Sequence, residues 1–453
     1  MGSPYPPGQA STAVLSMRAS RGAVAASSWG LALLAVFAVL WVLQYGLRVA
    51  PLGPIGGVSL FQPLGAFQGD PPVQAASDWI TRRAPLLRKA FQEEVYGELP
   101  AASSVVRTAS RLVDANAFEG AGRIEEISLS VAGPKGPIPI DVLLALPRVT
   151  AGGAAPLIIA PNFCGNRAAL GDVYRDVSQP GWVAPRCRTA FGRVITESLH
   201  GKNIIRVPVA RLLHAGYAVM TFSPGEVVPD DPSLAAAAIE RLPPSDAEGP
   251  RVGAIGAWAW SISRIVDAAE SDPRLDSSRI AVFGHSRFGK TVLLAAAFDT
   301  RIHAVIANQS GRLGAAPSSD RSGEPLAALF ERFPHWFPMA AWRTEIAHTP
   351  PDQQLLLALI APRPLLLGGA SLDALADPVG AFQSARSASA AYRLFGGTGL
   401  EQGTMRATNL DADVAYYFRS GGHGVRSSDW AVAIAFLDRR FASNKASSTG
   451  SAK

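Results

Sequence analysis

Cysteine is scarce in this sequence, and charged residues are few. Only two cysteines, Cys164 and Cys187, occur among 453 residues, which excludes a multi-disulfide framework and a cysteine-based zinc site. They are either two buried thiols or, if the chain is exported, one disulfide. Charged residues make up 17% and hydrophobic residues 48%, so most of the chain must be globular rather than disordered.

Clustered positive charge is also missing. The formal net charge is +6, but lysine and arginine are scattered, with no basic stripe interleaved with aromatic residues. Such a stripe is the usual footprint of a nucleic-acid site, so we expect no nucleic-acid partner. The positive balance is compatible with an acidic substrate, and no repeated segment indicates a repeat array.

The N-terminal part of the chain predicts a membrane anchor. Residues 1–21 are predicted to be a flexible cytoplasmic tail. Residues 22–45 are predicted to be a transmembrane helix, because residues 22–43 contain no charge and their length is close to the ~20 residues that span a bilayer. Arg18 and Arg21 favour a cytoplasmic N-terminus. A cleaved signal peptide is the alternative and would make the protein secreted. Both interpretations place the rest of the chain outside the cytoplasm, for example in the periplasm.

Composition divides the remainder of the chain. Residues 46–76 are rich in glycine, proline and alanine and are predicted to be a linker. Residues 77–443 are predicted to be a catalytic domain, and residues 444–453 a disordered tail. Residues 76–96 have apolar residues at helical spacing, and residues 104–148 contain β-type runs that predict antiparallel edge strands.

Short apolar strands then alternate with helices. Strands are predicted at residues 156–160, 218–222, 280–283, 304–307 and 364–368, and helices at 207–214, 253–270, 291–298 and 353–359. This alternation predicts an α/β fold in three layers, αβα, with a mostly parallel sheet covered on both faces. Long insertions are expected over the end of the sheet that carries the active site, at residues 168–206, 223–252 and 312–350.

A strand, a tight turn and a helix meet at Ser286. The turn, residues 284–289, has the sequence Gly-His-Ser-Arg-Phe-Gly. This is the context of a nucleophile elbow, which predicts the α/β-hydrolase fold with Ser286 as the nucleophile. Gly284 and Gly289 would let the chain pass closely on both sides of the serine. The second glycine lies one residue further on than in the common Gly-x-Ser-x-Gly motif.

A serine nucleophile needs a base, and the base needs an acid that orients it. In this fold the acid follows the serine and the histidine comes last. His423 satisfies this order in a glycine-rich loop near the C-terminus and is predicted to be the base. Asp373, just beyond a late strand, is predicted to be the acid. Asp377 is the alternative, although it could instead cap or brace the loop.

Donors for an oxyanion are expected on both sides of the serine. The turn after the first parallel strand offers the backbone amides of Phe163, Cys164 and Gly165. The backbone amide and the guanidinium of Arg287 would face the same developing charge. Arg287 and Lys290 place two cations beside the nucleophile, which favours an anionic or hydroxyl-rich substrate unless they pair with acidic neighbours.

These segments resemble the glucuronoyl esterases, serine esterases that cleave the 4-O-methyl-glucuronoyl esters joining xylan to lignin, and more closely their bacterial branch. The motif Gly-x-Ser-Arg-x-Gly-Lys is specific to that family and accounts for the longer turn. The resemblance extends from about residue 79 to residue 441, and it rests on residues 93–97, 162–166, 253–260, 284–290, 308–311, 333–337, 352–364, 376–378 and 420–423.

The resemblance implies a role for individual residues. Ser286 would be the nucleophile, His423 the base and Arg287 an oxyanion contributor. Lys290 and Glu324 would contact the sugar hydroxyls.

The chain departs from the family at two positions. Many members carry the triad glutamate where this chain has Gln309, so the acid would be Asp373, as in members that use the later position. A tryptophan that members place two residues after that aspartate is Leu375 here. The candidate substrate-binding residues include Gln309, Leu375 and Trp336. The departures at Gln309 and Leu375 could change which sugar or aryl group the enzyme accepts.

We therefore expect a serine carboxylic-ester hydrolase that acts on (4-O-methyl)glucuronic acid esters in plant cell-wall material, small or polymeric, with no metal and no cofactor. One alternative is an acetyl or other carbohydrate esterase on the same scaffold. Another is a catalytically silent, membrane-tethered carbohydrate-binding protein. A transacylase shares the first half-reaction and stays open, as does the oligomeric state.

Overall fold

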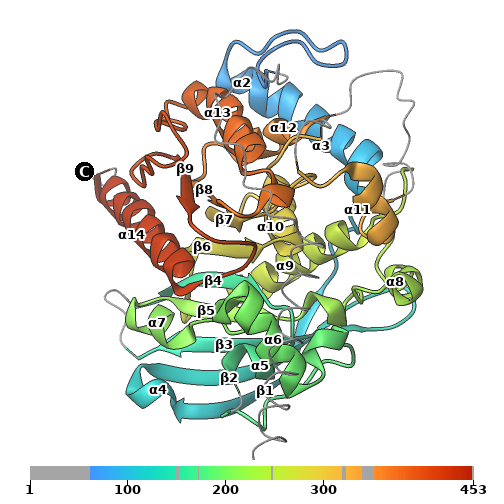
Figure 1. Ribbon diagram of the computed structural model, residues 1–453, viewed down its shortest axis with the longest axis vertical. Helices are drawn as coiled ribbons and strands as arrows, with labels where there is room; N and C mark the ends of the chain where they lie inside the picture. The colour runs from blue at the N-terminus through green and yellow to red at the C-terminus, as the bar shows by residue number, and fades with distance from the viewer. Residues whose placement is uncertain are drawn as a thin grey trace, which may run out of the picture. The chain divides into compact units, whose positions relative to one another are not determined.

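A nine-stranded mixed sheet organises the chain (Figure 1). The structure is a computed structural model that describes residues 62–148, 153–171, 173–245, 248–318, 323–338 and 351–450, with side chains up to residue 442. The strand order is β1-β2-β3-β5-β4-β6-β7-β8-β9. The strands are β1 (Val105–Asn116), β2 (Gly122–Val131), β3 (Ile138–Pro147), β4 (Ala155–Pro161), β5 (Ala218–Phe222), β6 (Leu275–His285), β7 (Ala304–Asn308), β8 (Leu365–Ala370) and β9 (Val414–Arg419).

Strand direction divides this sheet into two halves. β1, β2, β3 and β5 pair antiparallel, which confirms the edge strands expected within residues 104–148. β5, β4, β6, β7, β8 and β9 pair in parallel, and they include the predicted apolar strands. Because parallel strands end at the same edge, the residues that follow β6, β7 and β8 lie close together.

Successive strand residues enter two separate cores. In β4, Leu157 and Ile159 belong to one buried cluster, whereas Ile158 and Ala160 belong to the other. Adjacent strand residues point to opposite faces, so both faces of the sheet are buried. The helices α9, α10, α12 and α13 pack on one face, and α7 and α14 on the other (Figure 1). The α/β-hydrolase-like arrangement of the prediction is therefore present.

The helices fall into three groups. Those that cover the sheet are α7 (Val209–His214), α9 (Ala254–Glu270), α10 (Arg287–Phe298), α12 (Gln353–Ala358), α13 (Pro378–Leu394) and α14 (Ser427–Gly450). The insertions contain α5 (Asn166–Leu170), η3 (Pro185–Cys187), α6 (Ala190–His200), η4 (Lys202–Ile204), η5 (Pro224–Glu226), α8 (Pro232–Ile239) and α11 (Leu326–Arg332). The others are α2 (Ala76–Asp78), η1 (Trp79–Arg83), α3 (Ala84–Phe91), η2 (Gln92–Tyr96), α4 (Ala117–Gly120) and η7 (Ala374–Ala376).

Two predicted domain boundaries need correction. Residues 62–75 are not a linker: Phe67 and Val73 are buried in the main core, and Asp70 forms ion pairs with Arg82 and Arg83. The segment forms a tight turn, and its Pro63 and Pro71 carbonyls accept hydrogen bonds from the Arg83 guanidinium of η1. At the other end α14 continues to Gly450, beyond the predicted boundary at residue 443.

The predicted transmembrane segment, residues 22–45, lies outside the described residues. Within the part of the chain that the structure does describe, none of the helices has both the length and the apolar composition needed to cross a membrane.

Candidate active site

Ser286 occupies a sharp turn between β6 and α10. Its backbone angles are φ 57° and ψ −124°, in a region that residues with side chains rarely adopt. The turn is held because the Ser286 N–H donates to the Asn308 carbonyl at the end of β7, at 2.9 Å. Such strain is retained where the surroundings enforce it, and here it lifts the serine clear of the sheet edge. The predicted nucleophile elbow is therefore present.

The glycines on either side are required by close packing. A Cβ atom at Gly284 would lie 2.1 Å from the Phe288 carbonyl oxygen. At Gly289 it would lie 2.9 Å from the Cβ of Ser310. Both approaches are shorter than side-chain contacts allow, so the two positions provide the room that the sequence predicted.

Asp373 and His423 are brought together at the carboxyl edge of the sheet. Asp373 follows β8 and His423 follows β9; the His423 Nδ1 lies 2.7 Å from the Asp373 Oδ2. The carboxylate is 4% exposed and the imidazole 35% exposed, so the pair is shielded on the aspartate side only. A carboxylate accepts from Nδ1–H, which leaves Nε2 as the basic nitrogen.

Asp377 has a different task. Its Oδ1 accepts a hydrogen bond from the Gly380 N–H at 2.9 Å and caps the N-terminus of α13. The geometry thus separates the two aspartates between which the sequence left a choice: Asp373 contacts His423, and Asp377 begins the next helix.

Gln309 holds the loop that carries His423. Its Nε2 donates to the Gly422 carbonyl at 3.3 Å, and its Oε1 accepts from the Gly424 N–H at 3.1 Å and from the Arg419 guanidinium at 3.2 Å. The side chain is buried, at 3% exposure, and both ends of its amide are engaged. The prediction that Gln309 binds substrate is therefore not supported by its position, because its polar atoms face the histidine loop.

Two further histidines flank His423. The ring of His285 lies 4.5 Å from the ring of His423, centroid to centroid, which places His423 beside the residue preceding Ser286. His200, at the end of α6, donates from Nδ1 to the His423 carbonyl at 2.8 Å. Burial lowers the pKa of both His200 and His285, so both stay neutral near pH 7. Sequence reasoning missed His200, since only the fold brings it to a loop more than two hundred residues away.

Arg287 is enclosed rather than free. Its guanidinium forms an ion pair with Asp230, and it lies over the rings of Trp336, Phe333 and Phe163 at 4.7, 5.3 and 5.9 Å from their centroids. Its side chain is 12% exposed. The sequence identified the arginine but not Asp230, which lies in the loop between η5 and α8 and carries no motif of its own.

Lys290 is a buried cation next to Glu324. Its Nζ donates to the carbonyls of Ser310 and Arg312 at 2.6 and 2.5 Å, and burial lowers its pKa to about 8. The negative charge of Glu324 opposes this shift, because it favours the protonated amine. The Glu324 N–H donates to the Leu375 carbonyl at 3.0 Å, so these three predicted residues do come together.

Trp336 is a supporting residue in this arrangement. It is 3% exposed and stacks on Phe333 with 3.8 Å between ring centroids. Its Nε1–H donates to the Asp230 Oδ1 at 2.8 Å. Because both faces and the polar edge are occupied, Trp336 orders the wall around Arg287 rather than presenting a free surface to a ligand.

The predicted oxyanion loop follows β4. The Gly165 N–H donates to the Asn162 Oδ1 at 2.7 Å, so this amide is used inside the loop. The amides of Phe163 and Cys164 remain the candidate donors. Cys164 forms a disulfide with Cys187 in η3, which resolves the choice between bridge and thiols and ties the loop to the first insertion.

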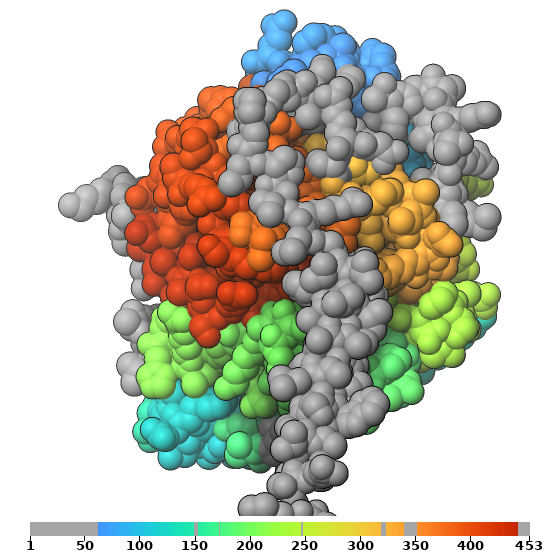
Figure 2. Space-filling model, viewed as in Figure 1, coloured from blue at the N-terminus to red at the C-terminus, as the bar shows by residue number. Residues whose placement is uncertain are grey.

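The described parts of the insertions converge on this edge, as predicted. The first insertion reaches the loop that carries His423, since the Val425 N–H donates to the His200 carbonyl at 2.8 Å. The second supplies Asp230 and the third supplies Trp336 and Glu324. In Figure 2 the red surface of the C-terminal elements adjoins the green surface that follows β4 in the chain.

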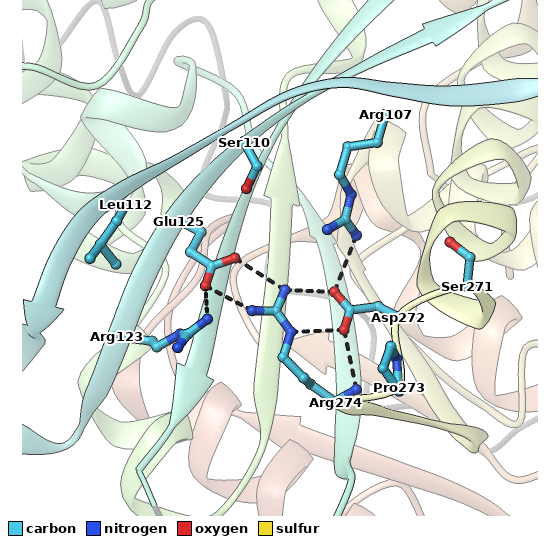
Figure 3. Close-up of a pocket in the computed structure, with 9 residues that line it drawn as sticks. All are labelled: Arg107, Ser110, Leu112, Arg123, Glu125, Ser271, Asp272, Pro273 and Arg274. Carbon is cyan, nitrogen blue, oxygen red and sulfur yellow. Dashed lines mark hydrogen bonds and ion pairs between the residues drawn. The ribbon is translucent and has the colours of Figure 1, made fainter.

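A large open cavity lies elsewhere, at the opposite end of β6 (Figure 3). Its volume is about 620 Å³, and its charged groups pair with one another. Arg274 contacts both Glu125 and Asp272, while Arg123 pairs with Glu125 and Arg107 with Asp272. This network joins β1 and β2 to the start of β6, roughly 30 Å along the strand from Ser286.

No metal centre is formed among the described residues, where histidine, cysteine, aspartate and glutamate do not gather in groups of three or more with suitable geometry. The polar groups gathered at the sheet edge fit an acyl-transfer centre: a strained serine, an oriented imidazole, and cationic and amide donors beside them.

Comparison with known proteins agrees with this geometry. The sequence profile of the family described as "Glucuronyl esterase, fungi" matches residues 204–396. The carbohydrate esterase MZ0003, from an unknown prokaryotic organism, is 32% identical over 381 residues, which cover 81% of this chain and 86% of that protein.

Solved structures give the same assignment. A promiscuous CE15 esterase from a marine bacterial metagenome is 31% identical with a TM-score of 0.73, covering 85% of this chain and 97% of that chain. A glucuronoyl esterase from Solibacter usitatus is 29% identical with a TM-score of 0.70, covering 85% and 98%. With an elbow serine, an oriented histidine and relatives that match along most of its length, this protein belongs to the CE15 glucuronoyl esterase family, in its bacterial type, and is a carboxylic ester hydrolase.

Proposed function

We propose that this enzyme hydrolyses esters of glucuronic acid or its 4-O-methyl derivative, with Ser286 as nucleophile, His423 as base and Asp373 as the orienting acid. The observation that carries the proposal is the 2.7 Å hydrogen bond between Asp373 and His423 beside a serine held at positive φ. The bond fixes the imidazole tautomer that can accept a proton from a hydroxyl.

In the first half-reaction Nε2 of His423 takes the proton of the Ser286 hydroxyl, and the serine oxygen attacks the carboxyl carbon of the ester. The carbonyl oxygen becomes an oxyanion. The backbone N–H and guanidinium of Arg287, together with the amides of Phe163 and Cys164, stabilise this charge. When the intermediate collapses, the alcohol leaves with the proton from His423, and the glucuronoyl group remains on Ser286.

In the second half-reaction water replaces the alcohol. His423 removes a proton from the water as it attacks the acyl-enzyme, and it returns that proton to the serine oxygen when the ester bond to Ser286 breaks. The products are the uronic acid and the alcohol. Asp230 and Glu324 offset the charges of Arg287 and Lys290, so these two cations act on the acyl group as directed hydrogen-bond donors.

The polar groups around Ser286 support a sugar as the acyl part. Lys290 and Glu324 lie together where β7 and β8 end, and Leu375 holds the glutamate through its carbonyl. An ammonium and a carboxylate offer a donor and an acceptor to the vicinal hydroxyls of a pyranose ring. The relative from Solibacter usitatus is described as a glucuronoyl esterase, which points to the same acyl group.

We also propose that the enzyme works outside the cytoplasm. The Cys164–Cys187 disulfide supports this location, because such bonds persist in oxidising compartments. A membrane anchor at residues 22–45 would keep the enzyme at the cell surface, and cleavage there would release it.

The test is a parallel assay of the exported part, from about residue 62, on benzyl glucuronate and on an acetyl ester. The Ser286→Ala variant serves as the blank. We expect glucuronate cleavage that the substitution abolishes. Absence of cleavage of both esters, together with no labelling of Ser286 by a fluorophosphonate probe, would overturn the proposal in favour of a silent carbohydrate-binding protein.

A second candidate, an acetyl or other carbohydrate esterase, is favoured by two observations. Leu375 stands where the family carries a tryptophan, and a related CE15 enzyme is described as promiscuous. Cleavage of the acetyl ester alone would select this function while keeping the same catalytic residues.

A further inference from the structure

Asp230 is a buried carboxylate that the reaction scheme above does not use. Three donors converge on its carboxylate: the Arg287 guanidinium on Oδ2, and His335 Nε2 and Trp336 Nε1 on Oδ1, at 3.0 and 2.8 Å. The carboxylate is 14% exposed. A carboxylate this buried is stable only when it is paired and hydrogen-bonded, and here both oxygens are engaged.

The surroundings hold Asp230 in place. The carbonyl of Val228, two residues earlier, accepts from the buried Trp258 Nε1 of α9 at 2.8 Å. The segment that carries His335 and Trp336 is fixed to the start of the same helix, since the N–H groups of Ala254 and Ile255 donate to their carbonyls at 2.8 and 3.2 Å. Both sides of the cluster are thus attached to one rigid helix.

His335 contributes to the cluster as a neutral donor. Burial and the neighbouring Arg287 lower its pKa to about 4, so the ring is uncharged near neutral pH and donates one N–H. Asp230 therefore carries the negative charge that faces Arg287, while His335 and Trp336 orient that charge without adding to it.

The contact restricts the orientation of the Arg287 guanidinium. Nη1 is bound to Asp230, and the aromatic rings of Trp336, Phe333 and Phe163 restrict the guanidinium plane. The Nε–H is buried without a hydrogen-bond partner among the described residues. In a planar guanidinium the direction of Nε–H is fixed once the far end is anchored.

We propose that Asp230 is a positioning residue of the oxyanion site: it anchors the Nη1 end of Arg287 so that the Nε edge is held ready for the oxyanion formed on the ester bound to Ser286. The proposal rests on the proposed function, in which Arg287 stabilises that charge. Asp230 acts through the arginine and does not touch the substrate. Its own charge partly neutralises the guanidinium, so the benefit is geometric and is realised in the transition state.

The experiment is a double-mutant cycle on the full chain with Asp230→Asn, Arg287→Ala and the combination, assayed on whichever ester the wild type cleaves. We expect Arg287→Ala to lower kcat about 100-fold or more and Asp230→Asn to lower it roughly 10–30-fold, each with KM changed less than about 3-fold. The combined variant should match Arg287→Ala alone, because Asp230 has nothing left to position.

Two companion variants separate positioning from folding. Asp231→Asn is the matched control: Asp231 is the adjacent aspartate but caps α8, where asparagine serves equally well, so kcat should not change. Trp336→Phe keeps the aromatic faces and removes one donor to Asp230. Trp336→Phe should lower kcat by a smaller factor than Asp230→Asn does. This loss should also vanish in the Arg287→Ala background.

A transition-state readout completes the test. A boronic acid that adds to Ser286 mimics the tetrahedral intermediate, and Asp230→Asn should weaken its binding by the same factor as kcat. Multiplicative losses in the double variant, or a kcat that stays the same or rises in Asp230→Asn, would overturn the positioning role. If Arg287→Ala leaves kcat unchanged, the oxyanion role of Arg287 in the proposed function fails instead, and Asp230 loses its task with it.

Discussion

The Oδ2 of Asp373 lies 2.7 Å from the Nδ1 of His423, although 50 residues separate the two in the chain. The parallel pairing of β8 with β9 produces this contact, because each residue belongs to the loop that follows one of these neighbouring strands. The family's more common acid position, at the end of β7, holds Gln309, whose amide supports the histidine loop instead.

Substitution of the two aspartates distinguishes their tasks. Asp373→Asn removes the acceptor that fixes the His423 tautomer, so we expect kcat to fall about 10³–10⁴-fold with a small change in KM. Asp377→Asn is the matched control, since asparagine both caps helices and tolerates positive φ. It should leave kcat within about 2-fold. Steady-state kinetics on the same ester decide between them, and a larger loss in Asp377→Asn would contradict the assignment.

Gln309→Glu tests whether the histidine loop needs an amide. A carboxylate can still accept from the Gly424 N–H and Arg419, but it cannot donate to the Gly422 carbonyl. We expect kcat to fall about 10-fold at pH 8. The hydrogen bond to the Gly422 carbonyl is replaced by repulsion between two oxygen atoms, which costs about 1–3 kcal/mol. At lower pH the loss should shrink, because a protonated glutamate donates again. The pH dependence of kcat measures this, and a variant faster than the wild type would show that a second acid is useful here.

Glu226 makes stability depend on pH. Burial raises its pKa to about 7, against 4.5 for the unperturbed group, and its Oε2 accepts from the Asp141 N–H at 2.9 Å. The folded state therefore binds the proton more tightly, so this contribution to stability is complete below pH 4.5 and is lost as the pH rises through about 7. Glu226→Gln should increase the free energy of unfolding by about 1–2 kcal/mol at pH 8 and leave it unchanged at pH 4.5. Denaturant unfolding at both pH values checks this, and equal effects at both would contradict it.

The disulfide connects stability to the oxyanion loop. Cys164 and Cys187 are 23 residues apart and join the loop after β4 to η3. The Cys164→Ala/Cys187→Ala variant should lose about 2–4 kcal/mol of unfolding free energy. Because Cys164 lies in the candidate oxyanion loop, kcat should fall as well. Thermal unfolding and kinetics measure both, with the wild type after reduction and alkylation as the comparison. An unchanged Tm would show that the bond adds no constraint.

The local pattern of apolar residues and glycines was enough to predict much of the fold. The apolar strands and the helices between them appear where the sequence placed them, because a buried parallel strand needs an apolar run and a turn needs glycine, and both are visible within ten residues. The elbow at Ser286 was predictable for the same reason. The order serine, aspartate, histidine pointed to Asp373 and His423, although it did not separate Asp373 from Asp377.

Other features depended on tertiary contacts. Composition predicted a linker that includes residues 62–75. The burial of Phe67 and the ion pairs of Asp70 show that these residues are part of the folded domain. Gln309, predicted to bind substrate, faces the loop around His423. His200 and Asp230 carry no motif at all.

The sequence by itself determined the strand pattern, the elbow and the candidates for the reacting side chains, since these follow from residues that are neighbours in the chain. Only the tertiary structure decided which acid orients His423, what Gln309 supports, whether the cysteines pair, and that Asp230 holds Arg287. The physical reason is that hydrogen bonds and ion pairs form within about 3–4 Å, and the chain brings distant residues to that separation only after the sheet and its insertions have packed.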